Sequence, residues 1–285
     1  MKSLQLFSKI KISLVNVPSV RLILLMCTIL IFTVFCSCSE TAIVSGPKKQ
    51  AVSYDEHTVK AVYPLRLRVS IDFGNIELYT WDKDDIKLET TARLRGTGPE
   101  DKLKEGLENF DLIINEGESE IEIKSIYNGP VKSPVDRSFD VKIYIPRSSG
   151  TISLQLDTGR IKIFDDIKCE LTARVNMANI DINRIEGTLK VEGDMCDLRV
   201  AQGELRSGST VKVNFGYIKV KAKLDESGTY DFETGSGNIE LSLPEKTKIN
   251  LDASGAIDTE DFENAEDGIK IRAYTGMGNV SINKY

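Results

Sequence analysis

The sequence predicts an all-β protein, a parallel β-solenoid with coils of about 20 residues and one short helix. Two observations lead to this fold class. A short phrase, in which a small residue and a turn residue precede an apolar–polar–apolar triplet, recurs along the second half of the chain. Between its copies, apolar and polar residues alternate with the period of two that is typical of half-buried strands.

The repeat is regular over residues 151–285, where one copy reads Gly159-Arg160-Ile161-Lys162-Ile163. Successive triplets begin 18 to 23 residues apart. A single coil cannot bury its apolar side, whereas stacked coils share one core. We therefore expect the first apolar residues of the triplets to line a common interior: Ile161, Ile180, Leu198, Ile218, Ile239, Ile257 and Val280.

Asparagine fills the turn position of several copies, because its side chain and backbone suit tight turns. We expect these residues to stack as a partial amide ladder: Asn75, Asn179, Asn238 and Asn279. The nearby glycine pairs, such as Gly235-Ser236-Gly237, are interpreted as coil corners, since no Lys-Ser/Thr follows them as in a phosphate loop. An antiparallel β-sandwich is the alternative fold, because strands every 8–12 residues are typical of it too.

Residues 61–150 are predicted to be the N-terminal strands and the helix of the same domain, which spans 61–285. Alternation at residues 65–71, 86–90, 111–115, 120–126 and 138–145 indicates strands. Pro99 and the spacing of Leu103, Leu107 and Phe110 predict the helix.

The first 38 residues are interpreted as an export signal. Basic residues lead into about fourteen apolar residues, which end at Cys36-Ser37-Cys38. Such a run is short for a membrane span of about 20 residues and suits a signal peptide. The end resembles a bacterial lipoprotein signal with Cys38 as the lipidated residue; an uncleaved membrane anchor and simple secretion are the alternatives. Residues 39–60 lack an apolar period and are predicted to be a flexible tether.

Composition and charge narrow the possible partners. The chain of 285 residues has a formal charge of −6, and residues 1–37 hold four basic residues and no acidic one. The rest therefore carries 33 basic against 43 acidic residues, a charge of −10. An acidic body argues against a nucleic-acid partner, because phosphate binding needs clustered Lys and Arg.

The sequence holds no convincing catalytic, metal or cofactor site. His57 is the single histidine and falls in the predicted tether, which argues against histidine-dependent triads and histidine-rich zinc sites. Cys169 and Cys196 are predicted to be buried thiols on different strands. The acidic run 258–267 does not match a calcium loop, and a weak surface cation site is the alternative there.

The runs Phe139–Pro146 (FDVKIYIP) and Ile152–Ile163 (ISLQLDTGRIKI) resemble the bacterial putative-adhesin family, which has no assigned function. In that family a strand ends on a proline and is followed by coils of the form Thr-Gly, turn, Ile-x-Val. The resemblance covers about residues 61–285. It implies an exported, solenoid-like domain that is often tethered to the cell envelope, and it brings no catalytic residues. The charged segment Glu100–Asp111 departs from the pattern.

We therefore expect a non-catalytic binding, adhesion or scaffold module at the envelope, held to the membrane by its N-terminal lipid or anchor helix. Its expected partners are envelope proteins or cell-wall glycan. A carbohydrate-active enzyme on a β-helix is the first alternative, because outward acidic residues are frequent, although glycosidases need a paired arrangement over a cleft. A regulatory partner in envelope stress is the second, by family analogy.

Overall fold

The computed structural model describes residues 47–61, 63–130, 135–147, 150–259, 262 and 264–285. The predicted signal and anchor at 1–38, with Cys38, lies outside them. Among the described residues, no helix has the length and apolar character that crossing a membrane requires. The elements before the regular repeats are β1 (Lys49–Lys60), β2 (Arg66–Trp81), β3 (Asp85–Gly96), α2 (Glu100–Leu107), β4 (Phe110–Glu116), β5 (Ile121–Tyr127) and β6 (Asp136–Pro146).

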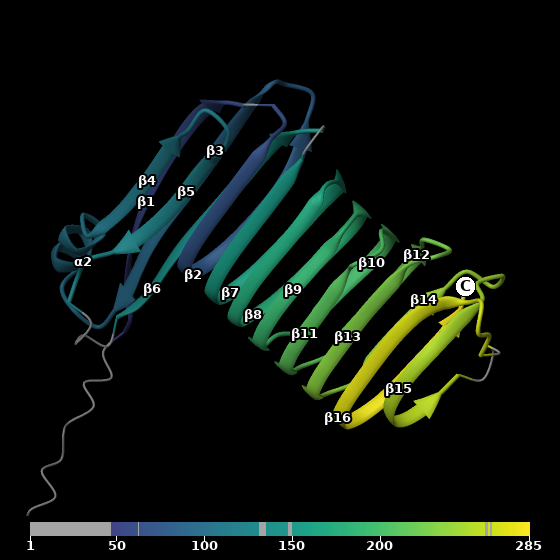
Figure 1. Ribbon diagram of the computed structural model, residues 1–285. Helices are drawn as coiled ribbons and strands as arrows, with labels where there is room; N and C mark the ends of the chain where they lie inside the picture. Colours follow the sequence, from purple (N-terminus) through teal and green to yellow (C-terminus); the bar gives the residue numbers. More distant parts are fainter. Residues whose placement is uncertain (1–46, 62, 131–134, 148–149, 260–261, 263) are drawn as a thin grey trace, which may run out of the picture. The chain divides into compact units, whose positions relative to one another are not determined.

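The repeats form a ladder of parallel strands (Figure 1). In chain order they are β7 (Thr151–Lys168), β8 (Glu170–Gly187), β9 (Leu189–Met195), β10 (Leu198–Leu205), β11 (Thr210–Phe215), β12 (Ile218–Leu224), β13 (Thr229–Ser236), β14 (Ile239–Leu243), β15 (Ile249–Asp258) and β16 (Ile269–Lys284). This is the predicted parallel solenoid. The antiparallel sandwich is wrong for the repeats, since antiparallel pairing among the described strands joins β1 to β3, β3 to β6 and β4 to β5.

Each coil contributes to two sheet faces that meet at a corner. The first face follows β4, β5, β2, β7, β8, β9, β11, β13, β16 and β15. The second follows β1, β3, β6, β2, β7, β8, β10, β12, β14 and β16. The long strands β2, β7, β8 and β16 run through both faces and turn at the corner, whereas the other coils use one strand for each face.

The interior is filled by columns of aliphatic side chains in register. Ile161 lies beside Ile180, which lies beside Leu198, and the column continues through Ile218, Ile239 and Val280. All six are at most 1% exposed. Burying such a side chain contributes about 1.5–3 kcal/mol, so the repeated column is a large part of what stabilises the stack.

Ile257 does not join this column. It is 51% exposed, because the neighbour of β14 is β16 and β15 lies outside β16. Val280 therefore takes the place beside Ile239, and Ile257 lies beside Val280 on the outermost strand. The chain passes outward to β15 and returns to insert β16 between β15 and the preceding coil.

The tether predicted for residues 39–60 is wrong over residues 49–60, which form β1. This strand pairs with β3 along its whole length. Of its side chains, Ala51 and Val59 are buried. An edge strand with one neighbour is held mainly by backbone hydrogen bonds, so it needs few apolar residues and leaves no strong alternation to detect.

Each end of the stack has its own cover. At the N-terminal end, Leu103 of α2 packs with Ala51 and Leu94 in a small separate cluster. At the other end, Asn264 bonds to the outer edge of β15: its Oδ1 accepts from the Leu251 N–H at 2.8 Å, and its Nδ2 donates to the Leu251 carbonyl at 3.4 Å. Covering an edge in this way prevents further strand addition there.

Candidate functional site

An exposed apolar ridge follows the corner between the two faces. The register places Met177 beside Met195, Met195 beside Phe215, Phe215 beside Ser236, and Ser236 beside Met277. We call Met177, Met195, Phe215 and Met277 the apolar ridge; they are 48, 54, 56 and 69% exposed. Tyr217 lies two residues beyond Phe215 and is 58% exposed.

The ridge exists because the corner interrupts the alternation of side chains. Along β8, Val175 and Ala178 are both buried, so the two residues between them, Asn176 and Met177, both lie outside. By simple alternation Met177 would point inward with Val175. The sequence analysis missed the ridge for this reason. The signal that reveals it is an apolar residue immediately before the small corner residue, as in Met177-Ala178, Met195-Cys196, Phe215-Gly216 and Met277-Gly278.

A row of carboxylates and amides lies directly beside the ridge. Asn176 Nδ2 donates to Asp157 Oδ1 at 2.9 Å, and Asn214 Nδ2 donates to Asp194 Oδ1 at 2.8 Å. Each bond joins one coil to the next. These aspartates lie at the surface of the molecule, so this side of the ridge is acidic.

The predicted turn asparagines lie beyond the corner, and their bonds differ from a ladder of amides. Asn238 Oδ1 accepts from the backbone N–H of Asn279 at 3.0 Å. Asn75 donates its N–H and Nδ2 to Asp140 Oδ1, each at 2.9 Å. In register with Asn179, Asp197 uses Oδ1 to accept from the Tyr217 N–H at 2.9 Å. Side-chain oxygens thus bind the backbone of the next coil and fix the corner.

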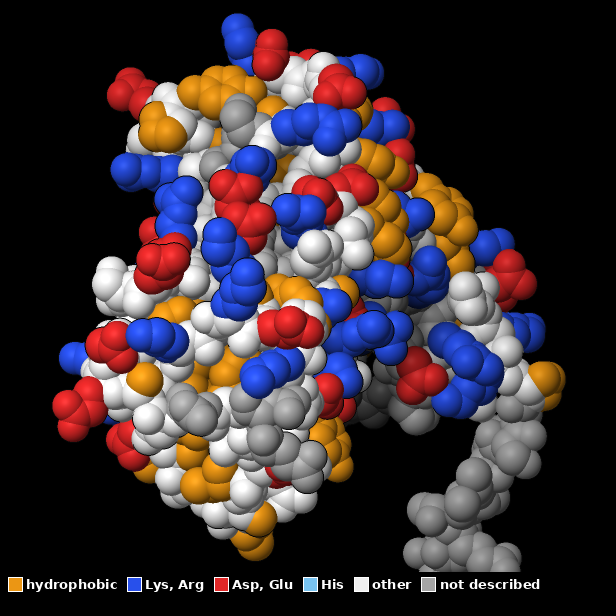
Figure 2. Space-filling view, turned by 90° about the vertical axis from the view of Figure 1, so that its right-hand side faces the viewer, with side chains coloured by type: hydrophobic (Ala, Val, Ile, Leu, Met, Phe, Trp, Pro, Cys, Tyr) orange, Lys and Arg blue, Asp and Glu red, His pale blue; other side chains and the backbone are white. Residues whose placement is uncertain are grey.

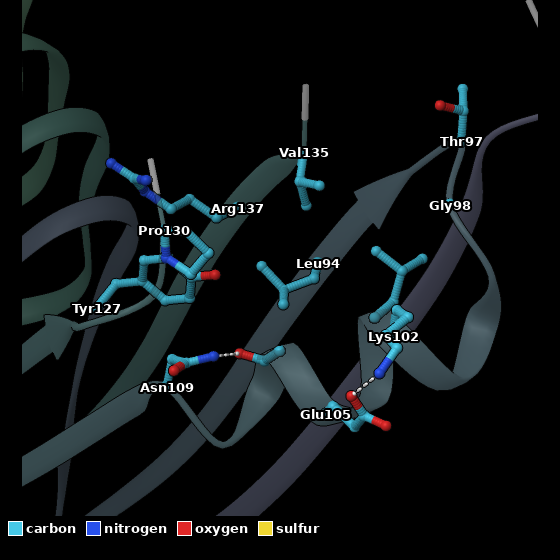
Figure 3. Close-up of a pocket in the computed structure, with 12 residues that line it drawn as sticks. Leu94, Thr97, Gly98, Lys102, Glu105, Asn109, Tyr127, Pro130, Val135 and Arg137 are labelled. Carbon is cyan, nitrogen blue, oxygen red and sulfur yellow. Dashed lines mark hydrogen bonds and ion pairs between the residues drawn. The ribbon is translucent and has the colours of Figure 1, made fainter. Parts of the chain in front are cut away.

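A cavity of about 540 Å³ lies between α2 and the ends of β3, β5 and β6 (Figure 3). Leu94 and Val135 point toward each other across it, whereas the guanidinium of Arg137 points away. That guanidinium lies over the rings of Phe73, 4.4 Å from the centroid, and Tyr127, at 5.1 Å.

The polar groups around this cavity already bond to the protein. Lys102 Nζ pairs with Glu105 at 2.6 Å, and Asn109 Nδ2 donates to the Gly106 carbonyl at 3.0 Å. Binding pockets orient a ligand through convergent polar groups. The drawn side chains do not converge in this way, so the cavity is a weaker candidate than the ridge.

Four aromatic residues form a row on the second face. Tyr79 stacks between Tyr144, at 5.1 Å between centroids, and Phe164, at 4.6 Å; Trp81 lies 5.7 Å from Tyr144. Both faces of Tyr79 are therefore covered. Burial, together with a hydrogen bond to Glu77, raises the pKa of Tyr79 to about 12. Sugars stack on open ring faces, and this row uses its faces for internal packing.

The other groups that the sequence raised have structural surroundings. Burial raises the pKa of the Cys196 thiol to about 12, and Asp197 adds to the shift. Cys169 is buried as well. Within the described part of the acidic segment, Asp267 pairs with Lys248 at 3.1 Å. No three or more His, Cys, Asp or Glu side chains gather as a metal site in the parts of the chain that the structure describes.

Charges on the outer surfaces are largely paired between coils. Lys219 pairs with Glu240 at 2.7 Å, Arg174 with Glu192 at 3.0 Å and Lys212 with Glu233 at 3.2 Å. In Figure 2 basic and acidic side chains intermix, with small groups of hydrophobic side chains between them. Such mixed surfaces are solvated flanks.

The chain was compared with solved structures and with curated proteins. Among solved structures, the chain is similar to a putative adhesin from Parabacteroides merdae (TM-score 0.46, 12% identity, 81% of this chain and 95% of that chain covered). It is also similar to a putative cell adhesion protein from Clostridium sporogenes (0.39, 12%, 82% and 100%) and to a putative adhesin from Bacteroides fragilis (0.36, 13%, 82% and 97%). A comparison with curated proteins finds no match.

The family assignment comes from a family model. The family model described as Toastrack DUF4097 matches residues 26–283, which include α2, β1 to β15 and all of β16 except its last residue. This confirms the family resemblance seen in the sequence. The chain belongs to the Toastrack DUF4097 family.

Proposed function

We propose that this protein is a non-catalytic binding module that holds a partner protein through the apolar ridge. The observation that carries the proposal is the ridge itself, in which four large apolar side chains lie along one corner, about half or more exposed. Contiguous exposed apolar surface, rimmed by polar residues, is typical of interaction sites. Methionine suits such a surface because its side chain is flexible and polarisable.

The rigid stack supports this role. The ridge residues belong to strands that are hydrogen-bonded on both sides, and side-chain bonds such as Asn214 to Asp194 join the coils beside them. A ligand therefore meets a preorganised surface and orders few groups on binding. The carbohydrate-active alternative gains no support from the aromatic row, whose rings and carboxylates bond to each other.

We further propose that the module works outside the cytoplasm, tethered at the cell envelope by its N-terminal segment. The basic and apolar pattern of residues 1–38 supports export, and Cys38 is the proposed lipidation site. Mass spectrometry of the mature protein tests this proposal. We expect a diacylated or triacylated cysteine at position 38. An unmodified N-terminus beginning at Met1 in a cytosolic protein would contradict it.

Capture from an envelope extract tests the binding role. The wild-type protein is compared with the ridge variant Met195→Ser/Phe215→Ser and with a matched control, Tyr54→Ser/Ile113→Ser. The control removes two exposed apolar side chains, 75 and 37% exposed, at the other end of the molecule. We expect the ridge variant to lose captured proteins that the control retains. Equal capture by all three would refute the ridge as the binding surface.

A further inference from the structure

The interval between side chains of the ridge matches the backbone repeat of an α-helix better than that of a β-strand. Neighbouring strands lie about 4.8 Å apart, so Met177, Met195 and Phe215 follow each other at about that interval, and Met277 lies two intervals beyond Phe215. An α-helix returns a side chain to the same side every turn, about 5.4 Å along its axis. In an extended strand the same-side interval is about 6.8 Å. A helix therefore stays nearly in phase with the ridge over four or five coils, and a strand does not.

The interruption at Ser236 fits the same partner. Ser236 stands between Phe215 and Met277 in the register of the corner. The two large side chains are then two coils apart, about 10 Å. A small residue between them leaves room for a large apolar side chain from a helix lying along the ridge.

The charges beside the ridge indicate which charge the polar side chains of the partner carry. Asp157, Asp194 and Asp197 lie beside the ridge, and each accepts a hydrogen bond from an asparagine amide or a backbone N–H. On the side of Asp157 and Asp194, the cations one row farther, Arg174 and Lys212, are paired with Glu192 and Glu233. The Asp197 side is mixed in charge, because Arg160 and Arg199 are exposed there. The side of the ridge that carries Asp157 and Asp194 therefore attracts a cationic partner.

The same charges disfavour a second copy of this chain as the occupant. A copy docked ridge to ridge would bring the Asp157 and Asp194 row against an identical acidic row, and like charges in an interface are costly. The four side chains of the ridge also offer less surface than the roughly 800 Å² per partner of a stable interface. We therefore expect binding to the ridge to be weak and reversible.

We propose that the ridge binds one amphipathic α-helix of a partner protein, with an apolar residue on each turn and Lys or Arg on the flank that faces Asp157 and Asp194. This rests on the proposed function and names the partner class for the same surface. Helix binding in a linear apolar surface uses anchors at i, i+3 or i+4 and i+7. Met195 and Phe215 are the central contacts, and Asp194 is the central charge.

Synthetic peptides test the proposal directly against the full protein. The probe is an 18-residue Leu/Lys peptide with leucine at helical spacing, followed by fluorescence anisotropy. Two comparison peptides change one property each: a Leu/Glu peptide has the same spacing, and a Leu/Lys peptide has strictly alternating residues. We expect the helical Leu/Lys peptide to bind at least tenfold more tightly than either of them.

Variants separate the apolar contribution from the charge contribution. Met195→Ser/Phe215→Ser leaves every carboxylate in place, and we expect it to weaken binding at least tenfold. Asp194→Asn keeps the apolar ridge, and we expect a loss of two- to fivefold that disappears in 0.5 M salt. Tyr54→Ser/Ile113→Ser should bind as the wild type does. Unchanged urea unfolding midpoints show that the exposed substitutions leave the fold intact.

Three outcomes would overturn the helix assignment. They are equal binding of the Leu/Glu peptide, tighter binding of the alternating peptide, and binding that the ridge variant leaves unchanged. A ridge-dependent dimer in sedimentation velocity would also overturn it, in favour of a second copy. If the helical Leu/Lys peptide does not bind but capture from the envelope extract still depends on Met195 and Phe215, the proposed function is supported and the assignment of a helical partner is wrong. If the peptide does not bind and capture does not depend on the ridge, the proposed function and the helical partner are both wrong.

Discussion

Gly237 shows what a single residue contributes at the corner of a coil. Its φ is +145°, which L side chains rarely adopt, and a Cβ built on it would overlap the carbonyl oxygen of Gly216 in the coil below. Substitution therefore strains the backbone and separates two hydrogen-bonded coils. We expect Gly237→Ala to lower the free energy of unfolding by about 3 kcal/mol, measured by urea denaturation.

Gly208 provides the matched control for that substitution. Its φ is also positive, at +84°, but a Cβ built there has no atom within 4 Å. Gly208→Ala therefore carries the backbone cost without the contact between coils, about 1 kcal/mol. If the two variants lost equal stability, close stacking at the corner would not explain the glycine at 237.

Tyr230 is a buried polar residue whose hydroxyl connects two coils. The hydroxyl donates to the Leu205 carbonyl at 2.9 Å and accepts from the Asp225 N–H at 2.7 Å, and burial raises its pKa to about 12. Tyr230→Phe keeps the ring and removes the hydroxyl partner of both backbone groups. We expect a loss of about 1–3 kcal/mol in the free energy of unfolding. Tyr217→Phe, at an exposed ring, should leave the urea midpoint unchanged.

At the level of elements, the sequence predicts those strands whose apolar residues alternate. The inward residues of β7, such as Leu154 and Ile161, follow that pattern and are buried. β1 escaped the prediction because an edge strand needs few apolar residues. The ridge escaped because the corner puts two successive residues outside, so that Met177 breaks the period that identified its neighbours.

The cover over β15 leads to a prediction about one element. Asn264 supplies to Leu251 the acceptor and donor that a further strand would supply. We expect Asn264→Ala to raise the hydrogen-exchange rate of the Leu251 amide at least tenfold, a loss of about 1.4 kcal/mol in local protection. The opened edge should also increase association at high protein concentration.

Asn183→Ala is the control for that experiment, because Asn183 is an exposed residue of β8, a strand with neighbours on both sides. Its exchange pattern at Leu251 should equal that of the wild type. An unchanged Leu251 amide in Asn264→Ala would mean that other parts of the segment after β15 protect the edge.

At the level of the whole molecule, the repeat predicts the stacking and leaves the order of the last coils open. Local spacing identifies Ile257 and Val280 as equivalent positions. Which of them lies beside Ile239 depends on whether β14 pairs with β15 or with β16, and the two strands have a similar pattern of apolar residues. The structure places β16 beside β14, so the last strand in the chain is an interior strand of the stack.

This order of strands predicts that removing β16 also exposes β15. A chain ending at Asp267 lacks β16, which is the strand that β15 pairs with along Ile249–Asp258. β15 then loses its hydrogen-bonded neighbour although its own sequence is intact. We expect its amides to exchange at least tenfold faster, and the urea midpoint to match that of a chain ending at Lys248, which lacks both strands.

A chain ending at Ile282 is the control, since it keeps every residue of β16 that pairs with β15, as far as Ser281. Its residues 249–258 should stay protected. In a solenoid that simply adds coils in chain order, the chain ending at Asp267 would instead keep β15 stacked on the preceding coil and unfold at a higher urea concentration than the chain ending at Lys248. Protection of residues 249–258 in that chain would therefore contradict the insertion of β16, because the amides of β15 would have found β13 and β14 as partners.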